Sequence, residues 1–123
     1  MTAEKILLTS VREATDAIDL VGSNNSALMA TRAIHINVLL RVVPGDEARL
    51  LKWTYNDVGA EAAISRQAYQ EEEGAVTDMI VMGTVYQHRE VRRVLADNPA
   101  LRPWIDAIEN VVENATETLD ARY

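Results

Sequence analysis

The sequence predicts an all-α fold: a small bundle of four to five helices in one domain over residues 1–123. Three observations support this fold class. Apolar residues recur at alternating spacings of four and three in several segments, as in a helix with one buried face. Glycine and proline stand where helix ends are expected. Phenylalanine is absent, so the core must consist mainly of smaller aliphatic side chains, which allow close helix packing.

The first helix is predicted from about Ala3 to Val21. Thr2 is a suitable N-cap, and Gly22 is a natural stop because glycine accepts the left-handed conformation that ends many helices. The apolar stripe of this helix consists of Leu7, Val11, Ala14, Ile18 and Val21.

Residues 27–43 fit two structures. Their Ala-Leu-Met-Ala start and their length favour a helix, whereas their β-branched content favours a strand. The helical stripe would be Met29, Ala33, Ile36, Leu40 and Val43, and the strand face would be Ile34, Ile36, Val38, Leu40 and Val42. We predict the helix and keep a strand near residues 33–43 as the alternative.

A break at Pro44-Gly45-Asp46 separates this segment from the next helix. Asp46 can cap a helix that begins at Glu47 and ends in the acidic run 71–73, with a possible interruption at residues 56–59. One face of this helix carries Leu51, Tyr55, Val58, Ala62 and, two turns further, Tyr69.

Residues 75–97 repeat the helix-or-strand ambiguity. We predict one helix with Gly83 as a packing point, and a strand near residues 77–87 is the alternative. If both ambiguous segments were strands, the fold would be α/β or α+β, with a β-α-β unit in its middle.

The last helix is predicted from Trp104 to about Asp120, with Pro103 at a favourable first position. Its apolar stripe is Ile105, Ile108, Val112, Ala115 and Leu119, and an acidic stripe lies beside it: Asp106, Glu109, Glu113, Glu117 and Asp120.

Composition narrows the function classes. The net charge of −7 argues against generic nucleic-acid binding, because a protein that tracks phosphates is normally basic. The chain has no cysteine, and charged residues interrupt any signal-peptide core near its start, so we expect a cytoplasmic protein. No apolar run is long enough to span a bilayer.

Two charged clusters are the candidate binding sites. His88, Arg89, Arg92 and Arg93 form a basic cluster that could hold a phosphate, a nucleotide or an acidic partner, because guanidinium groups bind oxyanions. The alternative is pairing of these bases with the acidic run 71–73 or with the last helix. The acidic face of Asp106, Glu109, Glu113 and Glu117 is either solvated or a docking surface for a basic partner.

No motif for catalysis, a metal or a cofactor is present. Carboxylates along one helix cannot surround an ion, and two histidines are too few for a histidine-rich zinc site. The leading hypothesis is therefore a non-enzymatic assembly or adaptor protein that acts as a homo-oligomer. The alternative is a domain that binds or sequesters a small anionic ligand through the basic cluster at residues 88–93.

Overall fold

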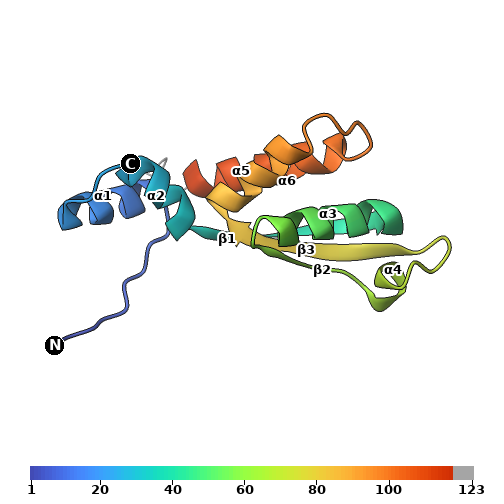
Figure 1. Cartoon of the computed structure of the whole chain (residues 1–123), viewed down its shortest axis with the longest axis horizontal. Helices are drawn as coiled ribbons and strands as arrows, with labels where there is room; N and C mark the ends of the chain where they lie inside the picture. Colours follow the sequence, from blue (N-terminus) through green and yellow to red (C-terminus); the bar gives the residue numbers. More distant parts are fainter. Residues whose placement is uncertain (118–123) are drawn as a thin grey trace.

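The computed structural model describes residues 1–117 and contains a mixed α/β fold, so the all-α prediction is wrong. Six helices accompany a three-stranded antiparallel sheet in this part of the chain. Helices α3, α5 and α6 lie on one side of the sheet, and α1 and α2 form a pair at one end (Figure 1). The elements are α1 Val11–Val21, α2 Ser26–Ala33, β1 His35–Pro44, α3 Gly45–Asp57, β2 Glu61–Ala63, α4 Arg66–Tyr69, β3 Val76–Thr84, α5 Val85–Val94 and α6 Arg102–Glu117.

The strand order in the sheet is β1-β3-β2. Both neighbours of β3 run antiparallel to it, so β1 and β2 are parallel to each other and β3 is inserted between them. Helix α3 connects β1 to β2, which makes β1-α3-β2 a split β-α-β unit. The β-α-β unit expected from strands near residues 33–43 and 77–87 does not form, because β1 and β3 are antiparallel neighbours. The second strand of the observed unit is β2, which the sequence did not predict.

Both ambiguous segments contain strands, contrary to the helical prediction. Val38 and Leu40 of β1 face the helices, as do Met79 and Val81 of β3, and the residues between them are exposed or half-buried. This period-two burial is the strand pattern that the sequence offered as the alternative. Residues 26–33 do form a helix, so the first part of the segment 27–43 follows the helical prediction.

A bulge interrupts β1 after Leu40. The register with β3 shifts between Leu40 and Val43, and Val42 has a φ of 54°, which is unusual for a β-branched residue. The backbone N–H of Val42 donates to Asp78 Oδ1 at 2.9 Å, which satisfies the group that leaves the ladder. As a result Val43, and not Val42, is buried.

Helix boundaries differ from the predictions at several places. Helix α1 begins at Val11, eight residues later than predicted, because the Ser10 side chain accepts from the N–H of Glu13 and caps the helix there. Gly22 ends α1 in the left-handed conformation, as predicted. Asp46 lies inside the first turn of α3, whose N-cap is Pro44.

Helix α3 does not reach the acidic run 71–73. It ends at Asp57, within the interruption that the sequence indicated at residues 56–59, and Gly59 follows with a φ of 83°. The chain then forms the short strand β2 and the single-turn helix α4. Ala62 of the predicted helical stripe is buried, but from the sheet rather than from a helix.

Helix α6 covers the sheet with its predicted apolar stripe: Ile105, Ile108 and Val112 are buried. Trp104 Nε1 donates to Glu47 Oε1 at 2.9 Å and ties α6 to α3. Leu119 and Asp120 lie outside the described residues. Within residues 1–117, no helix has the length and apolar character that a membrane crossing requires.

Candidate functional site

The predicted basic cluster and the predicted acidic face lie opposite each other across a groove between α5 and α6. The α5–α6 groove has a volume of about 380 Å³. Its floor is apolar and comes mainly from α6 and α3: Ile105, Ile108, Val112 and Tyr55. Its walls carry both signs of charge: Arg89, Arg92, Arg93, Arg102, Asp106, Glu109 and Glu113. The structure therefore brings most of the sequence-predicted site residues together in one place.

Each arginine of the basic cluster has a carboxylate partner. Arg89 pairs with Glu113 at 3.3 Å and Arg92 with Glu109 at 2.5 Å, both across the groove. Arg93 pairs with Glu90, one turn back on its own helix, at 2.8 Å. The sequence alternative of pairing with the last helix is thus realised for two of the three arginines. An incoming anion would have to displace these carboxylates.

His88 lies beneath the arginines and is buried, with 4% of its surface exposed. Its Nε2 is 2.8 Å from the carbonyl oxygen of Ile36, and its Nδ1 is 2.7 Å from the hydroxyl of Tyr55. A carbonyl can only accept, so Nε2 carries a proton. Burial disfavours a second proton on the ring, and a neutral ring with its proton on Nε2 accepts at Nδ1 from the Tyr55 hydroxyl. Burial lowers the pKa of His88 and raises that of Tyr55, in keeping with two neutral groups.

The His88–Tyr55 pair joins three elements. His88 comes from α5, Tyr55 from α3 and Ile36 from β1, so one hydrogen-bonded chain holds two helices on the sheet. Sequence reasoning placed Tyr55 on an apolar face but missed this contact. The available signal was a tyrosine at a core position, because a buried hydroxyl needs a polar partner.

The acidic residues of α6 differ in their contacts. Glu109 and Glu113 are the partners of the arginines, whereas Asp106 is exposed at the wall of the groove. Glu117 is the last residue of α6, and its side chain lies outside the described part of the structure. Arg102, which the sequence did not single out, donates to the carbonyl of Ala96 at 2.9 Å. No carboxylate of residues 1–116 lies within ion-pair distance of Arg102.

Among residues 1–117, no helix covers the other face of the sheet (Figure 1). Leu39, Ile80 and Ala63 are paired across all three strands and form an apolar row on this open face. Leu39 is 49% exposed and Ile80 is 41% exposed. We call these three residues the open-face row.

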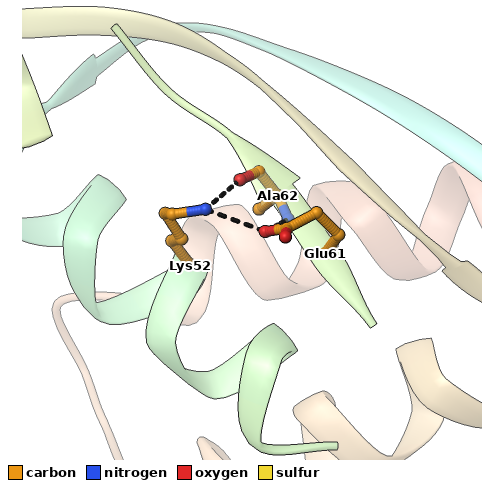
Figure 2. A network of polar contacts seen from close by, with 3 residues as sticks. All are labelled: Lys52, Glu61 and Ala62. Carbon is orange, nitrogen blue, oxygen red and sulfur yellow. Dashed lines mark hydrogen bonds and ion pairs between the residues drawn. The ribbon is translucent and has the colours of Figure 1, made fainter. Parts of the chain in front are cut away.

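Charges next to the open-face row are neutralised locally. Lys52 Nζ donates to Glu61 Oε1 at 2.8 Å and to the carbonyl of Ala62 at 2.6 Å (Figure 2). The Lys52 hydrogen bond lowers the pKa of Glu61, and so keeps that carboxyl ionised. On the other side of the row, Arg41 lies 3.6 Å from Asp78. The row is therefore flanked by paired charges.

Strand β1 also leaves one backbone edge without a strand partner. Its only strand partner among residues 1–117 is β3. The N–H of Val85 donates to the carbonyl of Ile34, which continues the β1–β3 register and fixes which residues exchange hydrogen bonds. Because bonded and non-bonded pairs alternate, the even residues of β1 face β3 up to the bulge. The N–H and C=O groups of the odd residues point to the free edge: His35, Asn37, Leu39 and Arg41.

Comparison of the chain with protein families, with curated proteins and with solved structures finds no match.

Proposed function

We propose that this chain is the subunit of a homo-oligomer, an assembly or adaptor protein that associates with its own copies through the open side of the sheet. The observation that carries the proposal is the open-face row: Leu39 and Ile80 are about half exposed, and Leu39 lies on a strand edge that has no strand partner among residues 1–117. Covering apolar side chains and unpaired strand edges is favourable, and symmetric self-association is the commonest way in which soluble proteins do so.

The local charge supports a second copy as the partner. Two copies of a chain with a net charge of −7 repel each other at long range. The open-face row avoids that penalty at contact, because its neighbouring acids Glu61 and Asp78 already have basic partners. A strongly basic partner would find no uncompensated carboxylate there.

Light scattering coupled to size exclusion tests the proposal. We expect the wild-type protein to have at least twice the mass of one chain. Leu39→Asp should release monomers, because a carboxylate would have to be desolvated in the contact. Val111→Asp is the matched control: Val111 is 43% exposed but lies on α6, away from the sheet, so its variant should keep the wild-type mass. A wild-type protein that is monomeric at all concentrations contradicts the proposal.

A second candidate function is the binding of a small anionic ligand in the α5–α6 groove. The observation in its favour is that four arginines line one groove, and that Arg102 has no carboxylate partner within residues 1–116. The three ion pairs of the basic cluster weigh against it, since a ligand must compete with them. Thermal-shift measurements with phosphate and nucleotides test this candidate: stabilisation that disappears in an Arg92→Ala, Arg93→Ala double variant supports it, and no response to any anion contradicts it.

A further inference from the structure

We infer that β1 pairs antiparallel with β1 of a second copy, so that two three-stranded sheets join into one continuous six-stranded sheet. This inference rests on the proposed function and names the geometry of its contact. It starts from the free edge of β1, where four residues direct their backbone groups away from the sheet.

The edge of β1 carries its protection against pairing only at its C-terminal end, where the charged side chain of Arg41 is exposed. Proteins shield edge strands with proline, lysine, bulges or a covering element. In β1 the only proline is Pro44, and the bulge lies between Leu40 and Val43, so both are at the C-terminal end of the edge. No lysine occurs in the strand. Residues 35–41 thus offer an extended edge of about 24 Å, at 3.4 Å per residue.

A second copy of β1 complements this edge best. Antiparallel pairing of a strand with itself is two-fold symmetric, so each free donor meets a free acceptor of the same strand. Full overlap of residues 35–41 places the two-fold symmetry axis between the Val38 residues of the two copies. Asn37 then lies opposite Leu39 of the second copy. Four residues of each copy then exchange both backbone bonds, which gives about eight hydrogen bonds across the junction.

The same pairing extends the open-face row. Leu39 is the last member of the row before the free edge, and Ile80 and Ala63 follow on β3 and β2. In the joined sheet the leucines of the two copies are diagonal neighbours at about 7–8 Å. The two rows would therefore meet in one apolar band across six strands.

The absence of cysteine makes the geometry measurable with single labels. Spin labels at Leu39→Cys and at Ala63→Cys report on the same face and the same row. Edge pairing places the Leu39 positions of two copies within about 8 Å, whereas the Ala63 positions are five strand spacings apart, about 24 Å. We expect strong short-range coupling and ready thiol cross-linking at Leu39→Cys only. Equal or closer approach at Ala63→Cys would show face-to-face packing and overturn edge pairing, while the homo-oligomer of the proposed function would stand.

A proline variant tests the backbone contact itself. The N–H of Asn37 points to the free edge, so Asn37→Pro removes no hydrogen bond of the β1–β3 ladder. The matched control is Asn37→Ala, because both variants lose the contact of Asn37 Oδ1 with His35 Nε2. We expect Asn37→Pro to weaken association at least tenfold and Asn37→Ala to leave it within about twofold, with the dichroism spectrum as a check on folding. If Asn37→Pro does not fold, the label distances decide alone. Association that Asn37→Pro leaves intact overturns the inference.

Discussion

Removal of the Tyr55 hydroxyl probes the contact that holds α3, α5 and β1 together. Tyr55→Phe keeps the ring in the core, where Tyr55 has no exposed surface, and deletes the donor 2.7 Å from His88 Nδ1. The imidazole then keeps its bond to Ile36 but has a buried acceptor without a partner. His88 cannot simply rotate to water, because it is itself buried.

The expected cost follows from that unpaired acceptor. A buried polar group that loses its partner costs about 1–3 kcal/mol of the free energy of unfolding. For a domain of this length, about 1 kcal/mol corresponds to a change in Tm of roughly 4 °C. We therefore expect the Tm of Tyr55→Phe to fall by about 4–12 °C.

Urea unfolding at one fixed protein concentration measures this cost, because the stability of an oligomer depends on concentration. Tyr69→Phe is the control: Tyr69 is 62% exposed, so the loss of its hydroxyl should change the free energy of unfolding by less than about 0.5 kcal/mol. If Tyr55→Phe were no less stable than Tyr69→Phe, the hydroxyl would not be a structural donor and the neutral His88–Tyr55 pair would be wrong.

Three further predictions concern the same layer of helices. Burial lowers the pKa of His88 below 6.5, so the unfolded state binds a proton more readily than the folded state. The contribution of neutral His88 to the free energy of unfolding is therefore complete above about pH 6.5 and is lost as the pH falls. Unfolding curves of a His88→Gln variant, measured over this pH range, should lack that part of the pH dependence. Ile108→Asp places a carboxylate in the buried stripe of α6 and should lower the free energy of unfolding in urea by about 3–5 kcal/mol. The control Val111→Asp, on the exposed side of α6, should lower it by less than about 1 kcal/mol. Equal losses in the two variants would mean that the stripe is not buried. A double-mutant cycle of Arg92→Ala and Glu109→Ala should give a coupling of at most about 1 kcal/mol, because half of the Arg92 side chain is in solvent; a larger value would show a strongly desolvated pair.

The error in fold class has a specific physical origin. Residues 34–43 satisfy a helical spacing through Ile36, Leu40 and Val43 and a strand spacing through Ile36, Val38 and Leu40. Local periodicity cannot decide between them, since both patterns use the same side chains. The deciding interaction is the ladder with β3, whose partner residues lie between 32 positions (Pro44 and Val76) and 49 positions (His35 and Thr84) away in the chain. Tertiary pairing therefore overrode the helix propensity that the start of the segment shows.

Other features were accessible from sequence because their causes are local. Gly22 ends α1, and the interruption at residues 56–59 ends α3, each through backbone conformations that glycine adopts easily. Gly83 was predicted as a packing point within a helix. It does serve close packing, but in β3: a Cβ at this position would lie 3.1 Å from Gln87 Oε1 and 3.3 Å from the Ala60 Cβ.

The site residues show the same division between local and distant causes. The arginines of α5 and the acids of α6 were both visible as stripes, and pairing between them was a stated alternative. Which arginine meets which carboxylate depends on the turn at residues 95–101, which sets how α6 returns along α5. The buried contact between Tyr55 and His88 spans 33 residues and depends on the packing of two helices, which no spacing rule contains.

The side chains on the two sides of the sheet differ in how many of them already have a partner within the chain. This difference favours the open side of the sheet over the α5–α6 groove as the place of association. On the helical side, the three arginines of the basic cluster have carboxylates and the buried imidazole has both of its partners. The net binding free energy of a ligand there is reduced by the cost of breaking those contacts. On the open side, Leu39 and Ile80 face solvent beside a strand edge that no strand of residues 1–117 covers, so a partner breaks no existing protein contact when it binds. For an equal contact area the open side therefore has the larger net gain, which is why the label distances at Leu39 and Ala63 are the measurements most informative about function.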